Sequence, residues 1–201
     1  MTDVTFYYDY GSPASYLAWT QLPAICARHG AGIDHRPILI GGLFKITGNR
    51  SPATVEAKGA WFFKDMARYA ERYGVPFEKN PYFIINSLPL MRGAIWAAEQ
   101  GRLQDYDRVM FEACWVNGRN LNDPKVIMAT LREGGFDADA IAAAIQTADI
   151  KQRLIEVTDE AAERGIFGLP TMLVGDEMHF GQDRLDWVEQ ALARHTAAPS
   201  S

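Results

Sequence analysis

The sequence has few cysteines and no redox pair. Of its 201 residues only Cys26 and Cys114 carry a thiol, and no Cys-x-x-Cys motif occurs. Exchange between a protein thiol and a disulfide requires a reactive thiolate, as found at the start of a helix. Both cysteines fall instead inside segments with helical patterning, so we expect small buried thiols in a reducing compartment. The chain itself is therefore not expected to exchange disulfides.

Histidine and clustered positive charge are also scarce. The four histidines are dispersed, and no two of them stand four residues apart, so no metal-ligand spacing is present. The formal net charge is −5, and lysine and arginine are scattered along the chain. Binding of nucleic acid depends on basic residues that gather on one surface. We therefore expect neither a metal site nor a nucleic-acid partner.

Long uncharged apolar runs are missing as well. Residues 1–4 lead directly into a strand-like segment, without a basic start followed by an apolar export segment. No later stretch is long and uncharged enough to span a bilayer. The sequence predicts no membrane partner and a cytoplasmic location.

What the sequence does contain is a βαβ pattern at its start. Hydrophobic residues make up 48% of the chain, which is enough for a sizeable core. Residues 5–8 are aromatic and strand-prone, and the Asp-Tyr-Gly-Ser-Pro segment after them predicts a helix that begins at Ser12. A second strand is expected over residues 33–38, parallel to the first. Pro23 is expected to kink or divide the helix between them.

The middle of the chain, from about Pro52 to Arg164, predicts helices only. Helix starts are indicated at Asp123, Asp137 and Asp149, and glycines that end helices stand at positions 74, 101, 134 and 165. After residue 165 the strand pattern returns, with a hairpin over residues 171–180 and a final helix. The order is therefore βαβ, a helical block, and ββα.

This order resembles the DsbA-type branch of the thioredoxin superfamily, an α/β fold (βαβ–ββα) with a large all-helical insertion. Residues 9–17, Asp-Tyr-Gly-Ser-Pro-Ala-Ser-Tyr-Leu, resemble the opening of the 2-hydroxychromene-2-carboxylate isomerases and kappa-class glutathione transferases. In these families a Ser-Pro-x-Ser stretch replaces Cys-x-x-Cys. Residues 165–171 and 181–185 match the same families near the C-terminus. The resemblance implies a glutathione-binding thioredoxin-like domain of residues 1–52 and 165–201, and a helical insertion domain of residues 53–164.

Ser12 is the expected catalytic residue. A serine hydroxyl needs an adjacent base to act as a nucleophile, and no such base is identified by its spacing. At a helix N-terminus, however, the hydroxyl and the backbone N–H groups can donate to an anion, which the helix dipole also favours. We expect Ser12 to hold the thiolate of bound glutathione and to lower the thiol pKa. The simpler alternative is that Ser12 only caps the helix.

The resemblance also implies further site residues. Glutathione, the expected cofactor, would contact Ser12, Asn49, Lys58, Leu169, Pro170, Gly181, Gln182, Asp183 and Arg184. A carboxylated aromatic substrate would contact Phe44, Lys45, Phe83 and Asn86. Arg50 and Ser51 stand where the kappa class usually has Lys-Pro. Simpler roles stay open: caps for Asn86 and Asp183, core packing for Phe83, a trans bond before Pro170, and solvated surface for the lysines.

The activity that the resemblance implies is glutathione-dependent cis–trans isomerisation in the breakdown of an aromatic compound. The thiolate would add to a conjugated double bond, allow rotation and leave again, and the protein would be a homodimer. One alternative is a transferase or peroxidase of the kappa type, which consumes glutathione. Another is a non-catalytic binder of thiols or peptides that has kept a DsbA-like groove.

Overall fold

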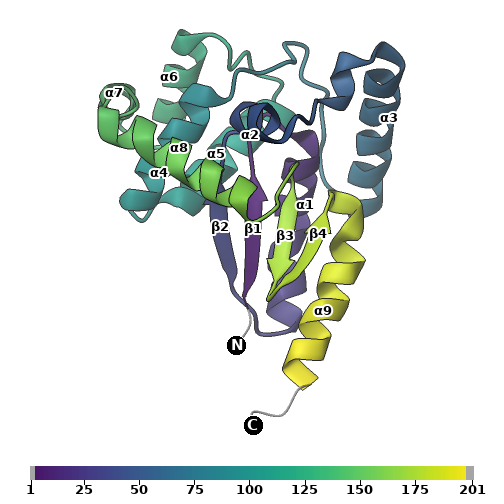
Figure 1. Ribbon diagram of the computed structural model, residues 1–201. Helices are drawn as coiled ribbons and strands as arrows, with labels where there is room; N and C mark the ends of the chain where they lie inside the picture. The colour runs from purple at the N-terminus through teal and green to yellow at the C-terminus, as the bar shows by residue number, and fades with distance from the viewer. Residues whose placement is uncertain (1–2, 198–201) are drawn as a thin grey trace.

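The computed structural model describes residues 3–197 and is built around a four-stranded mixed sheet of order β2-β1-β3-β4 (Figure 1). β1 (Val4–Tyr8) and β2 (Ile33–Pro37) pair in parallel, and α1 (Pro13–Arg28) connects them. β3 (Thr171–Val174) lies antiparallel between β1 and β4 (Glu177–Phe180). The predicted βαβ unit and C-terminal hairpin are confirmed.

Helices connect the two parts of the sheet. In chain order they are α2 (Ile40–Thr47), the 3-10 turn η1 (Pro52–Thr54), α3 (Glu56–Tyr73), α4 (Leu88–Glu99), α5 (Leu103–Trp115), α6 (Pro124–Glu133), α7 (Ala138–Ala144) and α8 (Ala148–Glu163). After β4, the turn η2 (Gln182–Arg184) leads into α9 (Leu185–Ala197).

Helix caps in the middle of the chain follow the sequence closely. Asp123 and Asp137 cap α6 and α7, as predicted, by accepting hydrogen bonds from the backbone N–H groups of Lys125 (2.8 Å) and Ala140 (3.0 Å). The predicted start at Asp149 is wrong, because Thr147 caps α8 and Asp149 lies in its first turn. Both Thr and Asp are favourable at these positions, so the sequence alone does not separate the cap from an acidic first turn.

Pro23 does not divide α1, which is continuous from Pro13 to Arg28. The Pro23 side chain is exposed, whereas Leu22 and Ile25 beside it are buried. Loss of one helical hydrogen bond at a proline costs about 3 kcal/mol, but burial of the apolar side chains on both sides of Pro23 outweighs this cost. Packing therefore overrides the local signal.

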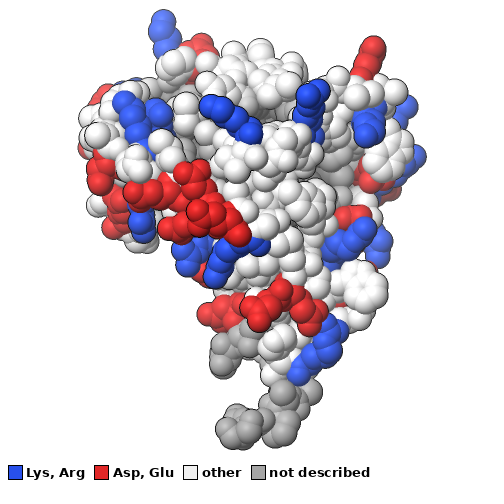
Figure 2. All heavy atoms as spheres, viewed as in Figure 1, with Lys and Arg blue, Asp and Glu red and all other residues white. Residues whose placement is uncertain are grey.

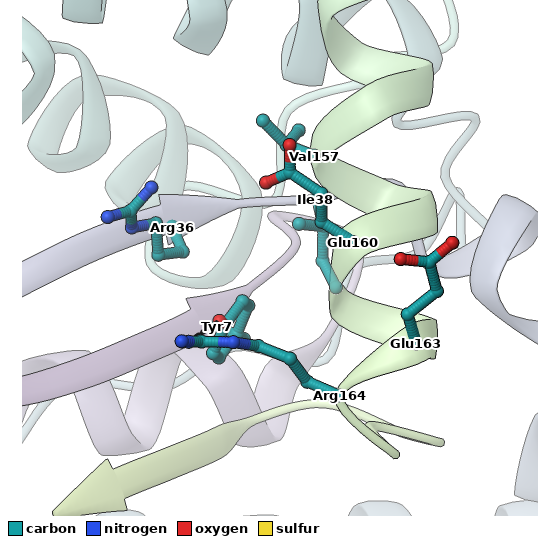
Figure 3. Close-up of a pocket in the computed structure, with 7 residues that line it drawn as sticks. All are labelled: Tyr7, Arg36, Ile38, Val157, Glu160, Glu163 and Arg164. Atoms are coloured by element: carbon teal, nitrogen blue, oxygen red, sulfur yellow. Dashed lines mark hydrogen bonds between the residues drawn. The ribbon is translucent and has the colours of Figure 1, made fainter. Parts of the chain in front are cut away.

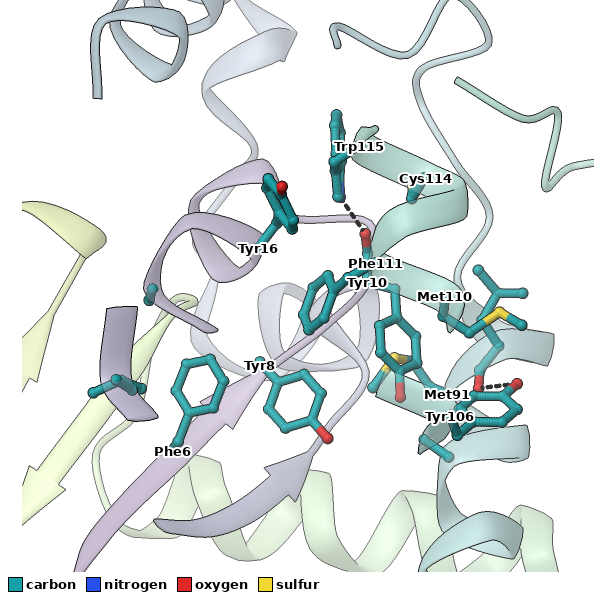
Figure 4. Packing of buried hydrophobic residues seen from close by; sticks show 14 of the residues in the cluster. Phe6, Tyr8, Tyr10, Tyr16, Met91, Tyr106, Met110, Phe111, Cys114 and Trp115 are labelled. Atoms are coloured by element: carbon teal, nitrogen blue, oxygen red, sulfur yellow. Dashed lines mark hydrogen bonds between the residues drawn. The ribbon is translucent and has the colours of Figure 1, made fainter. Parts of the chain in front are cut away.

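Residues of β1 alternate between two faces of the sheet. Phe6 and Tyr8 face the main core, where α1 and α9 pack, whereas Tyr7 faces a second core with side chains of α2 and α8. Figure 4 shows the aromatic line from Phe6 and Tyr8 to Phe111 and Trp115 of α5. The main core thus runs from the sheet into the helices. The division into two domains stays a prediction.

A buried carboxylate joins α5 to the sheet. Asp107 is fully buried, and its Oδ1 accepts hydrogen bonds of 2.6 Å from the hydroxyls of both Tyr8 and Tyr10. Its Oδ2 lies 3.1 Å from Nδ1 of His35 on β2. Burial raises the pKa of Tyr8 and Tyr10, and the Asp107 charge raises it further. Both phenols therefore stay protonated and act as donors.

Within residues 3–197, no helix combines the length and apolar character needed to cross a membrane. The same range contains no group of His, Cys, Asp or Glu side chains that could hold a metal ion. Cys26 and Cys114 are buried free thiols, and burial raises the pKa of Cys26 to about 11 and that of Cys114 further still. Neither thiol is poised to react.

Trp115 offers a test of the core beneath the Ser12 loop. It is fully buried, and its indole N–H donates to the Tyr10 carbonyl at 2.7 Å. Trp115→Phe should lower the free energy of unfolding by about 2–3 kcal/mol, because it removes this bond and leaves a gap. Urea unfolding measures the loss. Trp187→Phe, at a side chain that is 56% exposed, should change stability by less than about 0.5 kcal/mol, and equal losses would contradict the assignment.

Candidate active site

A cleft of about 600 Å³ lies where the N-terminus of α1, α2, α3 and the loop before β3 meet. Figure 1 shows these segments converging beyond the carboxyl end of β1. Of the residues predicted for the site, those that line the cleft are Ser12, Phe44, Asn49, Lys58, Phe83, Leu169, Gly181, Gln182 and Asp183. The structure thus brings together residues from both ends of the chain.

Ser12 caps α1 and faces the loop before β3. Its Oγ accepts a hydrogen bond from the backbone N–H of Ser15 at 3.1 Å and donates to the carbonyl of Leu169 at 3.4 Å. The side chain is 6% exposed, and α1 runs for 16 residues behind it. The hydroxyl therefore stands at the positive end of a full-length helix dipole.

Asp9 holds the loop that carries Ser12. It is fully buried, and its carboxylate accepts from the backbone N–H groups of Gly11 (2.7 Å) and Ile40 (2.9 Å) and from the Ser87 hydroxyl (2.8 Å). Its own carbonyl accepts from the N–H of Ser12 at 3.0 Å. Burial raises the pKa of Asp9 to about 6, and the three donors oppose that rise. One side chain thus fixes the starts of α1, α2 and α4 relative to one another.

The opposite wall is the Leu169–Pro170 loop, in which the peptide bond is cis. Besides the Ser12 contact, two hydrogen bonds tie this loop to its neighbours: the Gly181 N–H donates to the Pro170 carbonyl at 2.9 Å, and the Asn49 side chain donates to the Phe167 carbonyl at 2.8 Å. Gly181 has φ +100°, which L side chains rarely adopt. The glycine in the Gly-Gln-Asp-Arg-Leu motif is therefore required by the backbone.

Charged groups of both signs stand around the cleft. Lys58 on α3 and Arg50 in the loop after α2 are cations, and Asp65 and Asp183 are anions. Asp183 pairs with Arg184 at 2.6 Å. Gln182, which is 6% exposed, also lines the cleft. Such an arrangement suits a ligand that carries both carboxylates and an ammonium group.

Aromatic side chains form much of the remaining wall. Phe83 lines the cleft and also packs on the core, with its ring centroid 5.0 Å from that of Phe63. The core-packing role is confirmed, and contact with a substrate stays a prediction. Trp61 is 58% exposed. The half-exposed rings of Phe167 and Phe180 pack together, with their centroids 4.8 Å apart. Exposed aromatic rings that line a cleft favour binding of a planar apolar group.

Four predicted site residues do not line this cleft. The Pro170 carbonyl accepts the hydrogen bond from the Gly181 N–H, and Arg184 donates to the Asp183 carboxylate. Lys45 lies on the other side of α2, in a second pocket. Asn86 lines a third pocket between α4, α6 and α7, and its Oδ1 accepts from the Leu88 N–H at 3.3 Å, near the start of α4.

Sequence reasoning missed several cleft residues. Trp61 and Asp65 sit on α3, where helical periodicity marks them only as solvent-facing positions. Phe167 lies inside the Gly-Ile-Phe-Gly-Leu-Pro-Thr motif, which could have indicated it. Phe180 comes directly before the Gly-Gln-Asp-Arg-Leu motif, which offered a similar signal.

The raised pKa of Asp9 predicts a pH effect that a non-titrating variant isolates. A carboxyl whose pKa rises from 3.8 to about 6 on folding stabilises the fold below pH 3.8, and this contribution is lost as the pH rises through 6. Relative to Asp9→Asn, the wild type should therefore lose about 2 kcal/mol of its free energy of unfolding between pH 4 and pH 8. Urea unfolding at both pH values measures the difference. A constant difference would show that Asp9 has the same pKa in both states.

Comparison with known proteins places the chain in a family. The family model of the DsbA-like thioredoxin domain matches residues 3–193. Among curated relatives, a 2-hydroxychromene-2-carboxylate isomerase of Sphingobium xenophagum is 30% identical over 94% of this chain and 97% of its own length. One from Pseudomonas putida is 31% identical over 95% of this chain and 94% of its own. Glutathione S-transferase kappa 1 of Homo sapiens is 27% identical over 98% of this chain and 93% of its own.

Solved structures agree with the sequence comparison. A 2-hydroxychromene-2-carboxylate isomerase superimposes with a TM-score of 0.86 and 30% identity, covering 98% of this chain and 99% of its own. A probable DsbA oxidoreductase from Streptomyces coelicolor has a TM-score of 0.82 at 18% identity, over 100% of this chain and 92% of its own, and shows the fold alone. The chain therefore belongs to the DsbA-like thioredoxin family, in the branch of the 2-hydroxychromene-2-carboxylate isomerases and kappa-class glutathione transferases.

Proposed function

We propose that the protein is a glutathione-dependent cis–trans isomerase that acts on 2-hydroxychromene-2-carboxylate or a close aromatic analogue. The observation that carries the proposal is Ser12, a hydroxyl at the start of α1 that contacts Leu169 of the cis-proline loop in the wall of a cleft with aromatic rings. Relatives with this activity in their names are about as long as this chain and 30–31% identical to it.

The residues of the cleft fit a peptide thiol such as glutathione. The tripeptide has a carboxylate at each end and an ammonium group at one end. Asp183 and Gln182 would receive the end that carries the ammonium group, and Lys58 and Arg50 the carboxylate at the other. Between these ends the thiol would lie beside Ser12, and the backbone of Leu169 would receive the central residue of the peptide.

The chemistry that glutathione supplies when bound is reversible addition of its thiolate to a conjugated C=C bond, which becomes single, rotates and is restored when the thiolate leaves. The chain contributes the Ser12 hydroxyl and the positive end of α1, both of which favour the ionised sulfur. The positive charges of Lys58 and Arg50 favour the negative charge that builds up on the substrate carbonyl. Lys45, on the far side of α2, does not reach this cleft.

The aromatic wall supports an aromatic substrate. Trp61, Phe167 and Phe180 hold large exposed ring surfaces beside the cleft, although apolar surface of this kind is normally buried. A flat substrate would cover these rings and lie within reach of the sulfur.

Product analysis tests the proposed reaction. The protein is mixed with 2-hydroxychromene-2-carboxylate and glutathione, and both the isomer ratio and the free thiol are followed. We expect isomerisation that requires glutathione and leaves the thiol concentration constant. A falling thiol concentration with a conjugate as product would instead establish a kappa-type transferase, the alternative favoured by the relative that is 27% identical. Isomerisation at full rate without glutathione would refute the dependence.

The role of Ser12 predicts the titration of the bound sulfur. Ser12→Ala should still bind glutathione but raise the pKa of the bound thiol by about one unit, because one donor to the thiolate is lost. Absorbance of the thiolate in the ultraviolet, followed against pH, measures this shift. Ser15→Ala is the matched control: Ser15 is fully buried one turn further along α1, and its hydroxyl has no hydrogen-bond partner among the described residues. An unchanged titration in Ser12→Ala would remove Ser12 from the mechanism.

Several further expectations stay predictions of the sequence. They are the homodimer, the cytoplasmic location and a place in the breakdown of aromatic compounds. Calorimetry separates the proposal from the alternative of a non-catalytic binder. This alternative requires that a peptide binds beside Pro170 and that glutathione does not bind.

A further inference from the structure

A second pocket, of about 410 Å³, lies on the far side of α2, where this helix meets α4 and α8. α2 thus separates two cavities: Ile40 and Phe44 line the cleft described above, and Lys45 and Ile46 line the second pocket. The volume of this pocket falls in the range of sites for small molecules, about 300–1,000 Å³. We refer to it as the α2–α8 pocket.

The interior of the α2–α8 pocket is apolar. Leu88 of α4 and the buried Leu154 of α8 contribute to the lining, and Ile46 and Ile155, which are 52% and 53% exposed, stand on it as well. These two half-exposed isoleucines come from different helices and line the same cavity. They form an apolar surface that a ligand can cover.

The charges of the pocket are unbalanced. Lys45, Arg92 and Lys151 line it, and none of them forms an ion pair with any residue between 3 and 197. Nε of Arg92 is buried and has no hydrogen-bond partner there. The lining holds one acidic side chain, Asp159, which is exposed. A buried guanidinium donor without an acceptor is costly, and an anion that enters the pocket would remove this cost.

The cations of another cavity beside α8, in contrast, have partners within the protein. Figure 3 shows Arg164, at the end of α8, reaching the hydroxyl of Tyr7, to which it donates at 3.0 Å. Arg36 on the same cavity pairs with Asp34 at 2.7 Å, and glutamates of α8 line it too. Acidic side chains also gather over α8 on the face in Figure 2. The cations there have partners within the protein, whereas those of the α2–α8 pocket have no ion-pair partner between residues 3 and 197.

We propose that the α2–α8 pocket is a binding site for a small apolar carboxylate, such as an aromatic acid with one or two rings. The apolar lining receives the hydrocarbon part, and the carboxylate lies against Arg92, with Lys151 and Lys45 adding positive potential. This site is separate from the cleft at Ser12 and does not depend on glutathione.

Calorimetry with benzoate and 2-naphthoate tests the proposal on the full chain without glutathione. We expect saturable binding of 2-naphthoate that is about tenfold weaker in Arg92→Gln and in Lys151→Gln, since each removes a charged partner of the carboxylate. The neutral analogue 2-naphthamide should bind at least about tenfold more weakly than 2-naphthoate for the same reason. Lys151 is only partly buried, so Lys151→Gln keeps the test valid if Arg92→Gln does not fold.

Two control variants locate the binding. Lys125→Gln removes an exposed cation of α6 and should bind 2-naphthoate like the wild type. Lys58→Gln removes a cation of the Ser12 cleft, so it weakens only binding that takes place in that cleft. Weaker binding in Lys58→Gln together with normal binding in Arg92→Gln would place the acid in the cleft and overturn the proposal. Absence of binding, or equal binding of the amide, would overturn it as well. Because no step uses glutathione, these outcomes are independent of the proposed isomerase activity.

Discussion

The arrangement of the site depends on one buried carboxylate. Asp9 is placed after β1, where three segments that are distant in sequence come together, and it accepts hydrogen bonds from Gly11, Ile40 and Ser87. A buried charge is tolerated only when donors surround it, so the position of each segment is constrained by the other two. The position of Ser12 is therefore set by the interior of the protein rather than by its own loop.

The fold was largely predictable because its signals are local. The aromatic strand 5–8, the Gly-Asp turn after residue 174 and the caps Asp123 and Asp137 each identify an element without reference to the rest of the chain. The misses were equally local. The helix α2 lies before the predicted helical block and was not predicted. It contains Gly41 and Gly42, and glycine has a low helix propensity. Its contact with α8 is close: a Cβ at Gly42 would approach Thr158 to 3.3 Å, so tertiary packing explains what propensity did not.

The candidate site was predictable only where a motif carries it. The serine, the cis-proline loop and the Gly-Gln-Asp segment were recognised together and lie on one cleft. The direction in which each helix turns its side chains was not predictable. Phe44 and Lys45 are adjacent in sequence but line two different cavities, because neighbouring residues on a helix point about 100° apart. Trp61 and Phe180 come from distant parts of the chain, and only the folded structure shows that they share a wall.

The two hydrogen bonds of Ser12 use different parts of the same oxygen. Capping α1 occupies a lone pair, which accepts from Ser15, whereas the proton is directed at the Leu169 carbonyl across a long 3.4 Å contact. Rotation about the C–O bond can turn that proton toward an incoming anion while the lone-pair contact is kept. The residue can thus exchange one acceptor for another without loosening the end of the helix, and the framework that aligns the reaction does not have to move when a ligand arrives.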